Sequence, residues 1–288
     1  MELIIFVICL GLLQGITEFL PISSSGHLAL LESLPIFQHH VQQLERHFPL
    51  LAFNVILHMG TILAIVGYMV QEVKDITHGF FKALWQKNYR SRHFMTGLLI
   101  FAGTVPLVSV PFFKHQVERA VKSLEAIGYF FLGNALLLLL ADIFFRKMSR
   151  TKKPKNIYEM NMAQALVIGC FQALAVFPGI SRSGATITSA LFMHFEGSSA
   201  VRFSFLLSIP ALIGAFAFEI LDVLQHTTTP QLRVDLALLG IVSAYASGVL
   251  SIRFLAWLGQ KMLFYPFGIY TAILGLLVLF YLKFYAVV

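Results

Sequence analysis

The chain has 288 residues and a formal net charge of +7, and 58% of its residues are hydrophobic while only 12% are charged. Soluble domains carry about twice that charged fraction, so the composition excludes an ordinary soluble enzyme and predicts that lipid covers much of the surface. The basic residues cluster in short loops between apolar segments, where topology and anionic lipid account for them, so no nucleic-acid partner is expected. Cys9 and Cys170 lie in apolar runs without metal-ligand spacing, and we expect both to be buried.

In chain order, the apolar segments are of two kinds. Two regions, 3–34 and 161–194, are interrupted by the polar stretches FLPISSSGH and VFPGISRSGA, and we expect each to form two shorter helices joined by a loop, because Pro and Gly end helices. Such a loop is tolerated at membrane depth only where protein or water surrounds it, which predicts two re-entrant hairpins. Six further segments reach the length of about 20 residues that a bilayer requires. They are 50–70, 94–113, 126–145, 203–221, 236–252 and 264–282.

The distribution of Lys and Arg predicts the orientation of the chain. Fourteen of them fall on the side of loops 71–93 and 146–160, six fall on the other side, and Arg182 lies within a hairpin. By the positive-inside rule the first side is cytoplasmic, so both termini are expected outside. The first hairpin then enters from the outside and the second from the cytoplasm, and their tips can meet near the midplane.

The two hairpins also resemble each other. The stretch QGITEFLPISSSGH at 14–27 aligns with QALAVFPGISRSGA at 172–185 without a gap. Each hairpin precedes three spans, an odd number, so the second copy is inverted in the membrane, as in many transporters. We therefore predict an all-α integral membrane protein with an inverted-topology repeat, each half a re-entrant helix hairpin plus three transmembrane helices. It would form a single membrane domain, 1–288, with repeat one at 1–150 and repeat two at 157–288.

The hairpin tips have the residues of an anion site. Ser23 and Ser181 are natural N-caps for the second half-helices, whose first amides lack helical partners and carry a positive dipole end. Two such N-termini that converge can bind a phosphate. Arg182 adds a forked cationic donor, and an arginine at membrane depth is usually functional. The alternative is a structural pair between Arg182 and Glu18 across the repeat interface.

The first hairpin has candidate catalytic groups. Gln14 and Glu18 are four residues apart and share a helix face, and Glu18 is the only acid deep in either hairpin. Glu18 could take a proton, hold a divalent cation, or act as a structural acceptor. His27 follows Ser24 by three residues, so it could activate the Ser24 hydroxyl or shuttle a proton itself. His58, in the first full span, is expected only to pack.

The stretches QGITEFLPISSSGH and PGISRSGAT resemble the two characteristic motifs of the undecaprenyl-diphosphate phosphatase family, which is linked to bacitracin resistance. The first matches (E/Q)xxxE followed by a Pro–Ser-rich loop that ends in Gly-His. The second matches PGxSRSxxT in full, and the resemblance covers essentially the whole chain. It implies a multi-pass enzyme of the bacterial inner (plasma) membrane whose active site opens toward the periplasm. The implied reaction converts undecaprenyl diphosphate, a prenyl diphosphate lipid, to the monophosphate carrier used in cell-wall synthesis.

The resemblance also assigns roles to single residues. It implies that Glu18, Ser24, His27 and Arg182 are catalytic, with Ser24 attacking the phosphorus or His27 activating water. The implied cofactor is a divalent cation, Mg²⁺ or Ca²⁺, with Glu18 and Gln14 as ligands. Many members carry a glutamate where Gln14 stands, and an amide is the weaker ligand. The phosphate-binding residues expected from the tips and the motif are Ser23, Ser25, Ser181, Arg182, Ser183 and Thr186.

A second function stays open at this stage. The inverted repeat alone also fits a transporter or flippase of a lipid phosphate or small anion. The Ser–His–Glu set favours the hydrolase. The expected partners are the lipid substrate and the bilayer, and the assembly state, including a homodimer, is left open.

Overall fold

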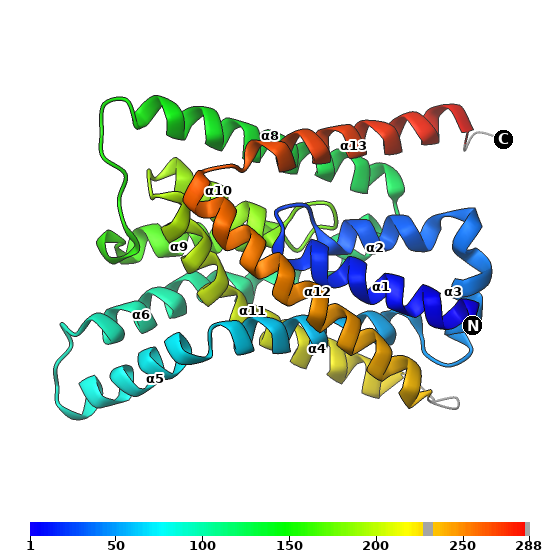
Figure 1. The fold of residues 1–288 in the computed structure, drawn as a ribbon, viewed down its shortest axis with the longest axis horizontal. Coiled ribbons are helices and arrows are strands. Elements are labelled where there is room, and N and C mark those ends of the chain that lie inside the picture. The colour runs from blue at the N-terminus through cyan, green and yellow to red at the C-terminus, as the bar shows by residue number, and fades with distance from the viewer. Residues whose placement is uncertain (227–232, 286–288) are drawn as a thin grey trace.

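The computed structural model describes residues 1–226 and 233–285, and every element in this part of the chain is helical (Figure 1). Short 3-10 segments join some of the helices: η1 (Pro35–Phe37), η2 (Val105–Phe113) and η3 (Ile157–Glu159). The α-helices are α1 (Glu2–Phe19), α2 (Ser24–Ser33), α3 (Gln38–Glu45), α4 (Leu50–Tyr68), α5 (Val70–Trp85), α6 (Arg92–Thr104), α7 (Lys114–Val121), α8 (Leu124–Met148), α9 (Met162–Leu174), α10 (Arg182–Phe192), α11 (Gly197–His226), α12 (Val234–Lys261) and α13 (Tyr265–Tyr285).

The long apolar helices identify a multi-pass membrane protein. Each predicted span coincides with a helix or, for 94–113, with α6 followed by η2. Within the described residues, six segments are long and apolar enough to cross a bilayer, and α4 with α5 forms a further candidate that is bent by 71°. The six are Glu2–Phe19, Arg92–Val121, Leu124–Met148, Gly197–Phe218, Val234–Lys261 and Tyr265–Phe284. The predicted all-α membrane fold is confirmed.

The ends of the chain and the basic loops lie at opposite ends of the molecule. Figure 1 shows the N-terminus and the C-terminal end of α13 at the same end of the longest axis. The turn between α5 and α6 and the C-terminal end of α8 lie at the opposite end. The basic loops therefore lie at the end away from the start of α1 and the end of α13, which is the arrangement that the positive-inside argument requires.

Both predicted helix breaks are present. α1 ends at Phe19 and α2 begins at Ser24, while α9 ends at Leu174 and α10 begins at Arg182. Ser23 caps α2 by accepting from the amide three residues later, and Ser181 caps α10 in the same way. The placement of the hairpins in a bilayer and the inverted repeat stay predictions. The predicted second repeat, 157–288, includes residues 227–232 and 286–288, which lie outside the described part.

Close packing against α12 places the first hairpin. α1 runs along α12, and a Cβ at Gly15 would overlap the Ser247 side chain and the backbone of Ala244. Small residues at such a contact let two helix backbones approach closely, as is typical of membrane helix pairs. A buried cluster that includes Phe19 and Phe205 then fills the space below the hairpin tip.

Two expectations need correction. The predicted loop 71–93 contains the helix α5, which packs on α6 through stacked Phe80 and Phe94 rings with centroids 4.9 Å apart. Its mixed apolar and charged sequence forms an amphipathic helix, which a search for uniformly apolar spans does not detect. Cys9 and Cys170 are exposed rather than buried. In a membrane helix, apolar sequence marks a lipid-facing surface as readily as a core.

Candidate active site

The tips of the two hairpins contact each other directly. The Gly179 amide of the second tip donates to Ser23 Oγ of the first over 3.0 Å. Ser181 Oγ donates to the Leu20 carbonyl over 3.3 Å. Gly26 permits this approach, because a Cβ at this position would lie only 3.0 Å from the Gly179 backbone. The two sequence motifs therefore form one structural unit.

Asn134 of α8 holds both tips. Its Nδ2 donates to the Pro21 carbonyl over 2.9 Å, and its Oδ1 accepts from the Ser181 amide over 3.0 Å. The side chain is fully buried, and both of its polar ends are satisfied by backbone groups of the tips. Sequence analysis missed this residue. The available signal was an amide in the otherwise strongly apolar span 126–145.

Glu18 lies where the tips meet and is 7% exposed. Its Oε2 accepts from the Ser24 hydroxyl over 2.6 Å and from the Gln14 amide over 3.1 Å. Its Oε1 accepts from Arg182 Nη2 over 2.7 Å. A buried carboxylate requires such partners because desolvation penalises its charge. The Glu18 carboxylate thus accepts hydrogen bonds from Gln14 of the same helix, from Ser24 of the first tip and from Arg182 of the second tip.

Arg182 forms an ion pair with Glu18 across the two hairpins, which was the structural alternative to phosphate binding. The pair occupies one terminal nitrogen of the guanidinium. Among the residues that the structure describes, the other two side-chain nitrogens have no hydrogen-bond partner. The side chain is 15% exposed, and a guanidinium has five N–H donors. The ion pair therefore leaves donors for a phosphate, and the two roles are compatible.

His27 makes no hydrogen bond to Ser24, although activation of the Ser24 hydroxyl is one of the two roles that the sequence leaves open for it. Its Nδ1 lies 2.7 Å from the Ser23 carbonyl oxygen, and its Nε2 lies 2.7 Å from the Tyr270 hydroxyl of α13. Residues three apart share a helix face, but a ring that bonds the carbonyl four residues earlier is directed back along the helix. The acceptor that serves the Ser24 hydroxyl is Glu18.

His58, which was expected only to pack, belongs to the site. Its Nδ1 lies 2.8 Å from the Asn54 carbonyl oxygen, and its Nε2 lies 3.8 Å from Glu18 Oε2. A carbonyl oxygen can only accept, so Nδ1 carries the hydrogen and Nε2 faces the carboxylate. The sequence offered no local signal for this contact, because α4 lies far from the first motif along the chain.

The predicted phosphate-binding serines differ in accessibility. Ser23 and Ser181 are buried as helix caps. Ser183 is also buried, and its Oγ lies 3.0 Å from Ser181 Oγ. Ser25 is exposed, with its Oγ 3.4 Å from Ser23 Oγ. Of these four hydroxyls, only that of Ser25 lies open at the tips.

Thr186 is fully engaged inside the protein. Its hydroxyl donates to the Arg182 carbonyl over 3.0 Å and lies 2.7 Å from Ser204 Oγ of α11. The residue is 1% exposed. In this geometry Thr186 supports the first turn of α10, which carries Arg182, and its predicted phosphate contact has no support.

Few groups near Glu18 could bind the expected divalent cation. Within residues 1–226 and 233–285, no group of three or more His, Cys, Asp or Glu side chains gathers at one point. Gln14 Oε1 is buried without a hydrogen-bond partner, so one amide oxygen is free beside the Glu18 carboxylate. This set fits an ion held chiefly by substrate phosphates, as Mg²⁺ often is. It does not fit a resident ion caged by protein ligands alone.

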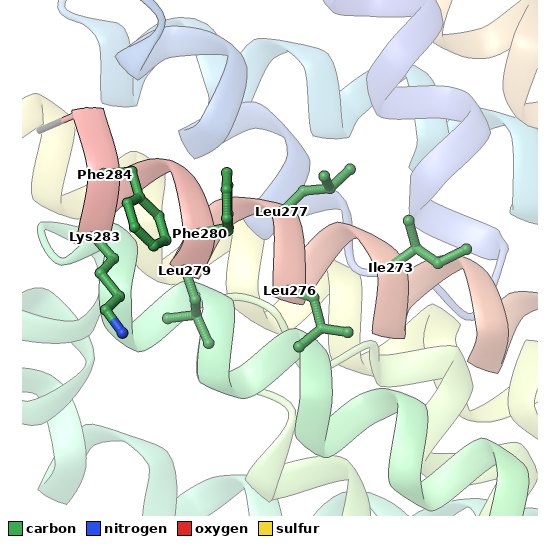
Figure 2. Close-up of a pocket in the computed structure, with 7 residues that line it drawn as sticks. All are labelled: Ile273, Leu276, Leu277, Leu279, Phe280, Lys283 and Phe284. Carbon is green, nitrogen blue, oxygen red and sulfur yellow. The ribbon is translucent and has the colours of Figure 1, made fainter.

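An apolar hollow of about 510 Å³ lies along α13 (Figure 2). It begins at Ile273, one helical turn beyond Tyr270, and contains none of the polar site residues described above. Its lining is Ile273, Leu276, Leu277, Leu279, Phe280, Lys283 and Phe284. The hollow is therefore a mainly apolar surface that begins one helical turn from Tyr270.

The fold and the site together define a class: a multi-pass membrane protein with a polar site between two broken-helix hairpins, where an acid, a serine and an arginine converge. The family model "Bacitracin resistance protein BacA" matches residues 7–277. The chain belongs to this family.

Similar proteins cover nearly the whole chain. It is 38% identical to "Undecaprenyl-diphosphatase 2" of Stutzerimonas stutzeri (strain A1501) over 282 residues, which is 96% of this chain and 98% of the relative. It is also 38% identical to "Undecaprenyl-diphosphatase" of Geotalea daltonii over 279 residues, covering 96% and 97% of the two chains. A third relative, "Undecaprenyl-diphosphatase" of Alkaliphilus metalliredigens, is 35% identical over 281 residues, or 95% and 97%.

Proposed function

We propose that this protein hydrolyses undecaprenyl diphosphate to undecaprenyl phosphate and inorganic phosphate, which recycles the lipid carrier for cell-wall synthesis. The observation that carries this proposal is the position of Glu18, which accepts the Ser24 hydroxyl and the Arg182 guanidinium at the junction of the two tips. The relatives named undecaprenyl-diphosphatase support the same activity.

The diphosphate head binds between the hairpin tips. Glu18 accepts from Nη2 of Arg182, and the second N–H of Nη2 with the neighbouring N–H of Nε or Nη1 still forms a forked donor that matches phosphate oxygens. The N-termini of α2 and α10 add backbone N–H groups and the positive ends of their dipoles. Phosphoryl transfer depends mainly on positioning and on charge neutralisation, which these groups provide.

The Ser24–Glu18 hydrogen bond favours Ser24 as the nucleophile. As Ser24 Oγ attacks the terminal phosphorus, its proton passes to Glu18. The bond from that phosphorus to the bridging oxygen breaks, and undecaprenyl phosphate leaves with the electron pair and takes up the proton. Water then attacks the phosphoserine. One water proton returns to Ser24 Oγ, and the rest of the water leaves with inorganic phosphate.

The prenyl tail lies outside the polar site. The hollow along α13 begins one turn from Tyr270, and six of its seven lining residues are apolar. An isoprenoid chain that extends from the tips along this surface stays in apolar contact while its head occupies the polar site. This arrangement accounts for a lipid diphosphate as the substrate.

A divalent cation, Mg²⁺ or Ca²⁺, accompanies the diphosphate in this proposal. Glu18 and the free Gln14 oxygen are the groups that would hold it, and when bound it would neutralise phosphate charge. Chelation should therefore lower kcat/KM for the substrate and leave the unfolding temperature of the ligand-free protein unchanged. A large loss of thermal stability with chelator would instead indicate a resident structural ion.

We propose that the protein lies in the bacterial inner membrane with its active site toward the periplasm. The basic loops at the end away from the start of α1 and the end of α13 support this orientation. A homodimer stays a prediction, and none of the residues named in the mechanism requires a second copy.

The activity is tested by measuring phosphate release from undecaprenyl diphosphate by the purified protein in detergent. Detergent has no compartments, so a transporter or flippase releases nothing there. Equal amounts of inorganic phosphate and undecaprenyl phosphate are expected. Binding of the lipid without release would favour the transport function.

A further inference from the structure

The His27 ring is held from both sides by fixed contacts. Its Nδ1 lies 2.7 Å from the Ser23 carbonyl oxygen, and its Nε2 lies 2.7 Å from the Tyr270 hydroxyl. The Tyr270 ring is nearly parallel to it, at 7°, while the Phe131 ring meets it edge-on at 83°. His27 is 9% exposed, whereas Tyr270 is 43% exposed. Tyr270 is therefore the outer member of the pair.

The hydrogen-bond partners fix the tautomer of His27. A carbonyl oxygen can only accept, so Nδ1 carries a hydrogen as long as its bond to Ser23 persists. In the neutral ring, Nε2 then has the lone pair and accepts from the Tyr270 hydroxyl. Both ring nitrogens of His27 are therefore engaged, Nδ1 by the first tip and Nε2 by Tyr270.

We propose that Tyr270 is a positioning residue of the hydrolase. Its hydroxyl holds His27 Nε2, and Nδ1–H of the same ring holds the Ser23 carbonyl, so Tyr270 fixes, through His27, the backbone that carries Ser24. This inference rests on the proposed hydrolase function.

The location of Tyr270 supports a role beyond packing. α13 packs mainly on α8, while Tyr270 reaches across to His27 in the first hairpin. Neither family motif contains Tyr270, and 243 residues separate it from His27. Tyr270 also directly precedes the apolar hollow, so it lies where the polar head and the prenyl tail of the substrate meet.

The test is a double-mutant cycle on the purified full-length protein, with undecaprenyl diphosphate as substrate. Tyr270→Phe keeps the stacked ring and removes only the hydroxyl. We expect kcat to fall about tenfold, as for the loss of one hydrogen bond, with KM within twofold of wild type. His27→Ala should lose more. The double variant should match His27→Ala within twofold, because Tyr270 acts through His27.

The control is Tyr129→Phe on α8, which removes the hydroxyl of a tyrosine that is 58% exposed and should leave kcat unchanged. Wild-type kcat in Tyr270→Phe would overturn the inference and leave the hydrolase function intact. A double variant that multiplies the two single losses would also overturn it, because the hydroxyl would then act independently of His27. A wild-type protein that releases no phosphate would overturn the function itself, and the inference with it.

Discussion

The residue that determines the chemistry of the first step is Ser24. Its hydroxyl donates to Glu18 over 2.6 Å, so a base is already in contact with it. Ser24→Ala should lower kcat by about 10²-fold or more and leave KM near the wild-type value, because the phosphate donors lie in other side chains. Ser33→Ala, at the far end of the same helix, is the matched control. A substantial residual kcat in Ser24→Ala would instead favour water activated by His27.

Arg182 has two roles that one substitution can separate. A lysine can still pair with Glu18, but it cannot present a fork to a phosphate. Arg182→Lys should therefore insert and purify normally while its kcat/KM falls roughly tenfold or more. Steady-state kinetics on the detergent-solubilised variant measure this. Turnover close to wild type would assign Arg182 to the structural pair alone.

At the residue scale, the two motifs identified the polar residues of the site but not the residues from other helices that contact them. Glu18, Ser24 and Arg182 meet because two helix breaks bring the motifs together, although the Glu18–Arg182 pair entered the sequence analysis only as an alternative. Sequence reasoning missed His58 and Tyr270, since their contacts depend on how distant helices pack. His27 bonds Ser23 and Tyr270 rather than Ser24, because helical spacing predicts a shared face and not the direction of a ring.

At the scale of elements, the close contact of the two tips is the critical feature. A Cβ on Gly26 would lie 2.7 Å from the Phe131 ring and 3.0 Å from the Gly179 backbone. Gly26→Ala should separate the tips, which lowers activity and costs about 1–3 kcal/mol of stability through overpacking. Thermal unfolding in detergent and phosphate release measure the two effects.

Gly133→Ala is the matched control, because a Cβ at Gly133 meets no atom within 4 Å and alanine favours a helix. Its stability should be unchanged or slightly raised. If Gly26→Ala and Gly133→Ala behaved alike, the tips would not depend on this close approach.

The elements themselves were largely predictable. Pro, Gly and Ser at 20–26 and 177–184 predicted both breaks, and uniform apolar runs predicted the spans. The helix α5 was not predicted, because its mixed sequence lacks the uniform hydrophobicity of a span, and its bend of 71° from α4 depends on packing against α6. Local sequence determines helices and breaks, whereas bends and surface helices also depend on tertiary contacts.

At the scale of the whole molecule, the orientation in the membrane can be tested with fusions. The N-terminus and the C-terminal end of α13 lie at one end of the molecule and the basic loops lie at the other. Reporters active only in the periplasm should therefore be active at both termini, and a fusion within loop 149–155 should report the cytoplasm. Cytoplasmic activity at either terminus would contradict this topology.

The central claim is that the Glu18 cluster hydrolyses a lipid diphosphate, and one comparison tests it most directly. Purified wild-type protein and Glu18→Gln are incubated in detergent with undecaprenyl diphosphate, and inorganic phosphate and undecaprenyl phosphate are measured together. The wild type should form both products in equal amounts. Glu18→Gln keeps the size of the side chain but removes the base and the negative charge that pairs with Arg182, so release should fall by about 10²-fold or more. Release from Glu18→Gln at the wild-type rate would contradict the account.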